Sequence, residues 1–316
     1  MKMRKTIFVF CILQSVICNL QSVIGQQLPL FSQYMLNDYF QNPAIAGSRP
    51  HFDVVSANRL QWVGITDAPR TYALSMQGPI KPKNMGVGGY LFTDIAGAMR
   101  RIGFSGSYAY HVKITDEIKI SLSLSAGILQ YAIDGSKLTL NDPSDYVFNG
   151  YQSSVVADLG TSFLLYGLPK ENGSGNWWLG GYVPQIFPAE LNLFSTPTPT
   201  GTLATHFYAT GGYKLFITDE FSAEPSFLVK FVSPVPVQID GGLRIFYKNK
   251  VWIGGTYRTN DAISTMVGYT YKDNLTFGYS YDITTTNLKN YNDGTHELII
   301  GLKFKPPVAA TAPKVE

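Results

Sequence analysis

Apolar and polar residues alternate along most of the chain, from about residue 51 to residue 304. In IKISLSLSAGI (118–128), every even position carries Ile, Leu or Ala, and every odd position carries Lys, Ser or Gly. The stretches IGFSGSYAY (102–110) and LTFGYSYD (275–282) follow the same period of two. Successive side chains of a strand point to opposite faces of a sheet. The pattern therefore predicts β-strands with one apolar face and one face of small or polar side chains.

Most of the alternating segments have about the length that a tilted strand needs to cross a bilayer. There are 14 of them: 51–62, 69–78, 84–94, 100–111, 117–129, 152–165, 175–184, 203–215, 220–231, 237–247, 250–258, 263–272, 275–284 and 295–304. Connections after even-numbered segments are mainly short, whereas those after odd-numbered segments include 130–151, 185–202 and 285–294. Outer-membrane barrels alternate short periplasmic turns with longer external loops. We therefore expect an all-β fold: a transmembrane antiparallel barrel (51–304) with both termini in the periplasm and a flexible tail (305–316).

The composition favours an outer-membrane barrel surrounded by lipid over a soluble β-sandwich. The chain has 20 Tyr, 19 Phe and 30 Gly, and only 15% of its residues are charged, against about 25% in soluble domains. Its polar strand faces carry mostly Ser, Gly and Thr, where a soluble sheet would expose Lys and Glu. Aromatic residues near strand ends, among them Trp177, Trp178, Tyr247 and Trp252, are expected to form girdles at the membrane interface.

The first 25 residues have the pattern of a secretory signal peptide, with a basic start, a short apolar core and small residues ending at Gly25. Lipidation at Cys18 is the alternative, which the bulky Ile17 disfavours. Cleavage after Gly25 would remove both cysteines, Cys11 and Cys18, so the mature chain would hold no disulfide. It would also lower Lys+Arg from 25 to 22, equal to the 22 Asp+Glu, which leaves no basic field for nucleic acid.

Charged residues of both signs fall on the inward-facing positions of several segments. These are Arg59, Lys119, Asp158, Glu224, Lys230, Asp240, Arg244 and Arg258. Glu224 and Arg244 lie at equal distances in sequence from Pro234, the centre of the turn between the ninth and tenth segments. We expect these two side chains to lie opposite each other and to form an ion pair across the barrel wall. The mixed signs favour an internal salt-bridge network over an ion-selective pore.

Residues 26–50 lie outside the alternating pattern and include FSQYMLNDYFQNPAIAGSR (31–49). Ser32 can cap the start of a helix, and Pro43 can end it, because the residue before a proline avoids helical backbone angles. The apolar surface of this stretch includes Phe31, Tyr34 and Met35. We expect the segment to enter the barrel as a plug or to cover its periplasmic mouth. Packing on the first strand is the alternative.

The sequence contains no recognisable catalytic or metal-binding motif. Its histidines, His51, His111, His206 and His296, are far apart, and it lacks H-E-x-x-H, G-x-S-x-G, phosphate-loop and EF-hand patterns. His296 and Glu297 are adjacent, so they point to opposite faces of a strand. We expect neither an enzyme nor a bound cofactor or metal.

Several short motifs stand out: FSQYM (31–35), NPA-AGS (42–48), QW-GI followed by APRT (61–71), and the closing GTHELIIGLKF (294–304). Together, and collinearly, they resemble the signatures of the PorP/SprF family of type IX secretion outer-membrane proteins. Ile45 departs from the family pattern, where an aromatic residue is common. The resemblance implies a component of the secretion and gliding machinery that binds the C-terminal secretion domain of a large secreted surface adhesin. Such a protein would help to deliver or anchor the adhesin, and it could contact periplasmic ring lipoproteins or the translocon.

The motif residues also have structural interpretations. The first external loop is flanked by Arg59, Trp62, Pro69 and Arg70. There, QW-GI-APRT forms either a clasp for the first hairpin or a contact for a partner. Asn42 and Pro43 belong to NPA-AGS, which is expected to form the turn from the leading segment into the first strand.

The external loops 130–151 and 185–202 are the expected partner surfaces. The second is unusually apolar for a loop and includes Phe187, Leu191 and Phe194. Exposed apolar patches often mark interaction sites; the alternative is that this loop folds into the barrel mouth. The alternative function is that of an outer-membrane porin or a transporter of small hydrophobic solutes.

Overall fold

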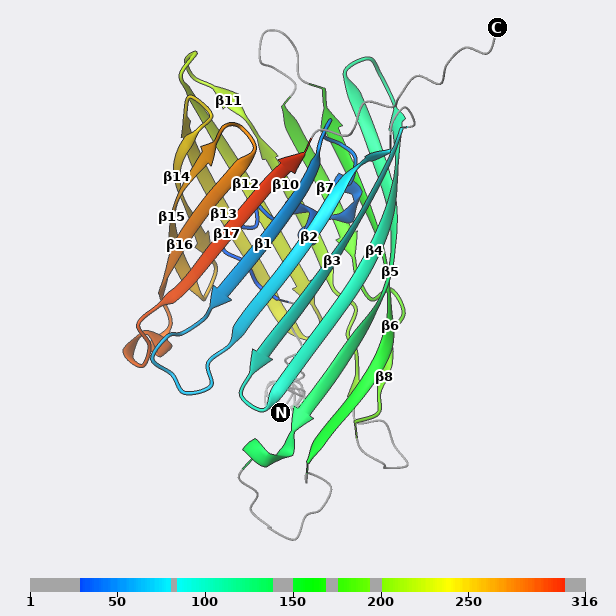
Figure 1. Ribbon diagram of the computed structural model, residues 1–316, viewed down its shortest axis with the longest axis vertical. Coiled ribbons are helices and arrows are strands. Elements are labelled where there is room, and N and C mark those ends of the chain that lie inside the picture. Colours follow the sequence, from blue (N-terminus) through cyan, green and yellow to red (C-terminus); the bar gives the residue numbers. More distant parts are fainter. Residues whose placement is uncertain (1–28, 81–83, 139–149, 169–175, 194–200, 305–316) are drawn as a thin grey trace, which may run out of the picture.

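The computed structural model describes residues 29–80, 84–138, 150–168, 176–193 and 201–304, which form an antiparallel β-barrel (Figure 1). Its strands are β1 (Phe52–Leu60), β2 (Arg70–Ile80), β3 (Met85–Ala96), β4 (Met99–Lys113), β5 (Ile118–Asp134), β6 (Tyr151–Gly167), β7 (Trp177–Val183), β8 (Glu190–Leu191), β9 (Gly201–Thr202), β10 (Phe207–Tyr213), β11 (Leu215–Phe216), β12 (Phe221–Val232), β13 (Val235–Tyr247), β14 (Val251–Arg258), β15 (Ala262–Tyr271), β16 (Leu275–Thr284) and β17 (Thr295–Phe304). Its helices are α2 (Asp38–Gln41) and the 3-10 helices η1 (Pro43–Ile45), η2 (Gly135–Lys137) and η4 (Asn287–Asn290). The expected signal peptide, the expected tail and Phe194 lie outside the described residues.

The strands pair in chain order, and the sheet closes on itself. β1 pairs with β17 over its whole length, from Phe52 opposite Phe304 to Leu60 opposite His296. β10 and β11 follow each other along β12, so the two together make one pass of the wall. β8 and β9 form a separate two-stranded sheet. Over the described residues, the wall therefore has 14 antiparallel passes, and the prediction of a 14-stranded barrel is confirmed.

The alternation along each strand separates a lipid-facing surface from the lumen. On β2, Leu74 and Met76 point outward and are each 49% exposed, whereas Thr71 and Ser75 point inward and are at most 4% exposed. A closed sheet satisfies its backbone hydrogen bonds internally, which the hydrocarbon core of a membrane requires. None of the helices in the described ranges is long and apolar enough to cross a membrane.

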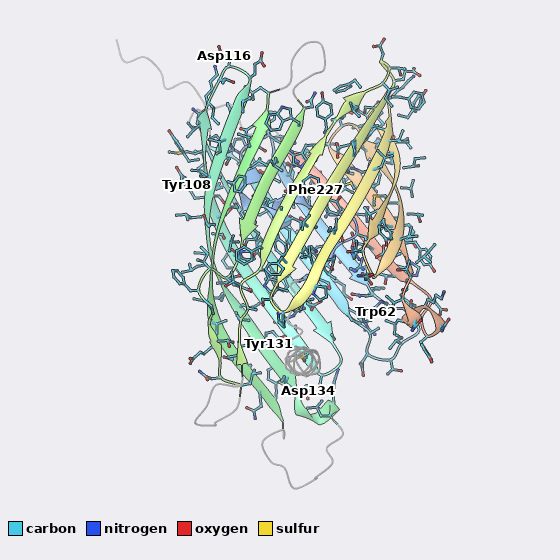
Figure 2. The ribbon with its side chains drawn as sticks, turned by 180° about the vertical axis from the view of Figure 1, so that it is seen from behind. Trp62, Tyr108, Asp116, Tyr131, Asp134 and Phe227 are labelled. Atoms are coloured by element: carbon cyan, nitrogen blue, oxygen red, sulfur yellow. The ribbon has the colours of Figure 1, made fainter. Side chains whose placement is uncertain are left out.

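The two ends of the barrel differ in their connections. The short-turn rim carries the connections 114–117, 217–220, 248–250 and 272–274, together with the start of β1 and the end of β17. The long-loop rim carries the connections 61–69, 184–206 and 285–294, together with three shorter ones at 97–98, 233–234 and 259–261. Figure 2 shows Asp116 at the short-turn rim, and Trp62 and Asp134 toward the opposite end.

Residues 29–51, called the lumen segment below, run inside the barrel from one rim toward the other. Leu30 lies beside Val232 and Pro236 at the long-loop rim. The N–H of Gly47 donates to Gln77 Oε1 at 3.0 Å, close to the short-turn rim. Figure 1 shows this part of the chain, in blue, within the ring of strands. The segment therefore lies inside the lumen and does not pack on the outer face of the first strand.

The lumen segment is less helical than its sequence suggests. Its α-helix is limited to Asp38–Gln41, and residues 31–37 form mainly turns. The expectation that Ser32 caps a helix is wrong, because the Ser32 hydroxyl donates to Asp282 Oδ2 at 2.6 Å. Pro43 does not end a long helix but begins the 3-10 helix η1. The barrel wall supplies hydrogen-bond partners to this stretch, so it does not need the internal bonds of a long helix.

Candidate functional site

A buried charge cluster fixes the start of the lumen segment near the long-loop rim. Arg59 of β1 lies between two carboxylates, with Nη2 2.9 Å from Asp282 Oδ2 and Nη1 3.2 Å from Glu297 Oε2. The backbone N–H groups of Ser32 and Gln33 donate to the Glu297 carboxylate at 2.7 and 2.9 Å. All five residues are at most 2% exposed. Because buried charges need full pairing and hydrogen bonding, the cluster joins the lumen segment and the wall into one unit.

Arg258 of β14 extends this cluster around the lumen. Its Nε lies 3.3 Å from Asp240 Oδ2, and its Nη1 lies 3.0 Å from Asp261 Oδ2. Its Nη2 donates to the backbone carbonyl of Phe31 at 3.4 Å. Arginines and carboxylates thus alternate around the start of the lumen segment. Ion-selective pores instead use rings of one sign of charge, so this arrangement suits holding a segment better than conducting ions.

Aromatic rings pack the middle of the lumen segment against β3. The ring centroid of Phe40 lies 5.2 Å from that of Phe31, 4.6 Å from Tyr90 and 5.8 Å from Phe92. Each such pair contributes about 0.5–1.5 kcal/mol beyond the burial of its area. Tyr34 is also buried, and its hydroxyl lies 3.1 Å from that of a serine on β12. The apolar surface expected from the sequence is therefore covered inside the barrel.

The motif NPA-AGS attaches the lumen segment to the wall formed by β4 to β6. Asn42 Nδ2 donates to the carbonyl of Phe163 at 2.9 Å, and Asn42 Oδ1 accepts from the N–H of Ala44 at 3.0 Å. The ring nitrogen Nε2 of His111 lies 2.8 Å from the carbonyl oxygen of Ala46. The motif therefore forms an anchored turn that precedes β1.

Arg49 pairs the lumen segment with itself and with β1 near the short-turn rim. Its guanidinium forms ion pairs with Asp38 and with Asp53, the second at 3.2 Å. Close by, a Cβ added to Gly86 would lie 1.9 Å from the carbonyl oxygen of Ala46. The lumen segment and β3 therefore meet backbone to backbone, at a position that only glycine fits.

Glu224 and Arg244 lie directly opposite each other on β12 and β13, and their side chains form an ion pair inside the barrel. The Arg244 guanidinium also lies 5.5 Å from the ring centroid of Trp252, which is 2% exposed. The expectation that Trp252 belongs to the interface girdle is therefore wrong. Its neighbours Val251 and Ile253 point outward instead, because the parity of a position, and not its closeness to a strand end, decides which face it takes.

The described parts of the connection between β7 and β10, residues 184–193 and 201–206, pack over the lumen at the long-loop rim. Leu191 and Leu203 belong to a buried apolar cluster that includes Tyr131 of β5. Leu191 is 1% exposed, so in this conformation it presents no surface to a partner. Phe187, by contrast, is 69% exposed.

The motif QW-GI-APRT joins the first and last long connections. The N–H of Val63 donates to the carbonyl of Gly294 at 2.9 Å, and the N–H of Trp62 donates to a threonine hydroxyl at the start of β17 at 3.0 Å. The carbonyl of Pro69 accepts from a glutamine N–H at 2.9 Å, and Arg70 is exposed at the start of β2. The bonds of Trp62 and Val63 cross the junction of β1 and β17, and the bond to Pro69 closes the connection between β1 and β2, so the geometry favours a clasp.

Of the two wall carboxylates that hold the lumen segment, Glu297 lies within the closing motif GTHELIIGLKF, whereas Asp282 belongs to none of the motifs. The alternation places Asp282 on the polar face of its strand. For Glu297 it predicts only that its side chain points to the face opposite that of His296, without deciding which of the two faces the lumen. An acidic residue on an inward face was the available signal. The strand pattern cannot reveal that these carboxylates bind Ser32, because the path of the lumen segment is not periodic.

The site is built for binding and positioning. The carboxylates of the cluster already accept hydrogen bonds from arginines or from backbone N–H groups. Nδ1 of His111 lies 3.0 Å from the hydroxyl of Tyr166, while its other nitrogen contacts the lumen segment. In the part of the chain that the structure describes, no three His, Cys, Asp or Glu side chains are grouped so that they could hold a metal ion.

Comparison with known proteins identifies the family. Residues 23–302 match the family model described as type IX secretion system membrane protein PorP/SprF, and no curated protein matches the chain. Similar solved structures include the Pseudomonas putida toluene transporter TodX, with 8% identity and a TM-score of 0.50 over 87% of this chain and 94% of that chain. Another is the Acinetobacter baumannii outer membrane protein Omp33, with 8% identity and a TM-score of 0.44 over 81% of this chain and 98% of that chain. At 8% identity, the likeness to TodX shows the barrel fold alone, and nothing is concluded from the weaker likeness to Omp33. Since the family match covers most of its length, the chain belongs to the PorP/SprF family of type IX secretion system membrane proteins.

Proposed function

We propose that this protein is a non-enzymatic outer-membrane component of type IX secretion that binds the C-terminal secretion domain of a secreted surface adhesin. In this role it helps to deliver the adhesin or to anchor it at the cell surface. The observation that carries the proposal is the lumen segment, which occupies the barrel interior and is fixed there by Arg59, Asp282 and Glu297. A barrel filled by its own chain suits a rigid platform better than a passage for solutes.

In the proposed orientation, the short-turn rim faces the periplasm and the long-loop rim faces the outside, as in other outer-membrane barrels. The end of β17 is then periplasmic, whereas Leu30 lies toward the outer end of the lumen. The short-turn rim is available to periplasmic ring lipoproteins or to the translocon. Phe187 is an exposed apolar residue of the expected adhesin-binding loop 185–202 and can contact a partner.

The test is surface display of the adhesin in cells that carry variants of this protein. A deletion strain should retain the adhesin inside the cell or release it into the medium. Phe187→Asp should lower display while the barrel remains folded. Tyr291→Asp is the matched control, because Tyr291 is 74% exposed on a different connection at the same rim. Normal display in the deletion strain would refute the adhesin role.

The second candidate is an outer-membrane porin or a transporter of small hydrophobic solutes. The supporting observation is that cavities of about 440 and 310 Å³ flank the lumen segment on the side of the short-turn rim. A transporter would have to move the lumen segment, whereas a platform would keep it fixed. Conductance in planar bilayers separates the two functions, because a platform should stay closed and a porin should pass steady currents.

A further inference from the structure

From the geometry of the smaller of these cavities, we infer a binding site for an apolar monocarboxylate, one carboxylate on a compact ring or short chain. The cavity has a volume of about 310 Å³ and lies between the lumen segment and the wall formed by β6, β7, β10 and β12. It reaches the turn residues Leu168 and Asn176, so it lies toward the short-turn rim. Sites for small molecules usually have volumes of about 300–1,000 Å³, and this one is at the lower end of that range.

One side of the cavity is apolar and aromatic. Ile45 of the lumen segment and Leu164 of β6 form a buried cluster, and the side chains of Tyr166 and Trp178 pack against it. All four residues line the cavity. Rings of this kind bury a large area and favour an aromatic or compact aliphatic body.

The other side offers hydrogen-bond donors that the described part of the chain leaves unused. Gln41 is 2% exposed and Thr210 is 8% exposed, and both line the cavity. Gln41 Nε2 and Thr210 Oγ1 make no hydrogen bond with any described residue. A buried donor without an acceptor is unfavourable, because it has lost its hydrogen bonds to water and gained none in the protein. A ligand that brings acceptor oxygens would remove this cost.

The charge around the cavity selects an anion. Two of its guanidinium groups are already committed, Arg49 to Asp38 and Arg244 to Glu224. Lys214 also lines the cavity, and its Nζ donates to an asparagine oxygen at 2.9 Å. Among the described residues, its ammonium forms no ion pair within 4.0 Å. Lys214 is thus a cation of the lining without a carboxylate partner among the described residues, and it shares the cavity with the two unused donors, which suits an anionic ligand.

The same groups argue against a peptide backbone as the occupant. An extended peptide brings equal numbers of N–H donors and carbonyl acceptors, whereas Gln41 Nε2 and the Lys214 ammonium only donate and the Thr210 hydroxyl can donate or accept. The cavity is also bounded by the lumen segment on one side, so it does not form a continuous groove along a strand edge. A small carboxylate meets both conditions.

The inference can be tested with the full mature protein in phosphatidylcholine nanodiscs by isothermal titration calorimetry. The probe is 3-phenylpropanoate, the neutral comparator is 3-phenylpropanamide, and empty nanodiscs give the blank. We expect saturable binding of one acid per barrel, at least about tenfold tighter than the amide, because hydrogen bonds to charged groups are the stronger ones. Equal affinity for acid and amide, or no saturable binding of the acid, would overturn the inference.

Variants locate the site. Lys214→Met should weaken binding of the acid at least about tenfold and leave binding of the amide nearly unchanged. Thr210→Val should weaken binding of both probes, because it removes a donor without changing shape. Lys250→Met is the matched control, since Lys250 is an exposed lysine in a short-turn-rim connection and does not line the cavity. If Lys214→Met bound the acid with unchanged affinity, the inference would be wrong. It would also be wrong if the peptide acetyl-Gly-Phe, which ends in a free carboxylate, bound the parent protein more tightly than 3-phenylpropanoate does. Neither outcome bears on adhesin display, so the proposed function is tested separately.

Discussion

At the scale of single residues, Arg59 joins the lumen segment to two buried carboxylates of the wall. Its guanidinium pairs with Asp282 and Glu297, and Nη1 also donates to the Ser32 hydroxyl at 2.6 Å. Arg59→Met would leave two buried carboxylates without their main counter-charge. We expect the free energy of unfolding to fall by about 3–5 kcal/mol, measured by guanidinium unfolding of the barrel in detergent micelles.

Arg100→Met is the control for this prediction, because Arg100 is an exposed arginine on β4. Its free energy of unfolding should stay within about 0.5 kcal/mol of the parent protein. If Arg59→Met cost no more than this control, the cluster would not hold the lumen segment.

The residues of this cluster show what the sequence could predict at this scale. Period-two parity assigned Arg59, Glu224 and Arg244 to the lumen, since a strand's geometry alone fixes the face of each position. The equal spacing of Glu224 and Arg244 from the turn predicted the register in which the structure places them. Trp252 was misplaced because an aromatic side chain near a strand end can face lipid or lumen, and only parity separates these cases.

At the scale of the element, the lumen segment decides whether the barrel conducts. The parent protein in planar bilayers should be closed, because residues 29–51 fill the lumen between the two rims. Deletion of residues 26–50 should give steady ohmic currents, since no other described segment runs along the lumen. Large steady currents from the parent protein would favour the porin instead.

Point variants test the same element without shortening the chain. A side chain on Gly86 would collide with the backbone of Ala46, so Gly86→Val should loosen the end of the lumen segment and give intermittent openings. Gly241→Val is the matched control, because a Cβ there meets nothing within 4 Å. If both variants were as closed as the parent protein, this contact would not hold the segment in place.

The elements also differ in how far the sequence could predict them. The strands were recognisable because each one repeats a local rule with period two. The lumen segment was recognisable as an exception to that rule, but its turns were not, because the carboxylates that bind its backbone come from β16 and β17, far away in sequence. The apolar loop after β7 could be either exposed to a partner or folded into the barrel mouth. Only the packing of Leu191 in the buried apolar cluster with Leu203 and Tyr131 decides that this residue is buried.

At the scale of the whole molecule, the junction of β1 and β17 is reinforced at several levels. Arg59 lies directly opposite Glu297 in the register of these strands. Ser32 of the lumen segment binds residues on β16 and β17, and the clasp at Val63 crosses the same junction outside the sheet. The pairing of β1 with β17, the binding of the lumen segment and the bonds of Val63 therefore depend on one another. We expect the barrel to unfold in a single cooperative step.

The orientation of the whole barrel can be tested by labelling single cysteines on intact cells with a membrane-impermeant maleimide. Asp219 and Lys289 are exposed residues at the short-turn rim and the long-loop rim, respectively. Since both native cysteines lie in the expected signal peptide, the mature parent protein supplies an unlabelled blank. Lys289→Cys should react on intact cells, and Asp219→Cys only after the outer membrane is permeabilised. The reverse labelling pattern would mean that the barrel has the opposite orientation in the membrane. The cavity of about 310 Å³ and the end of β17 would then lie toward the outside of the cell.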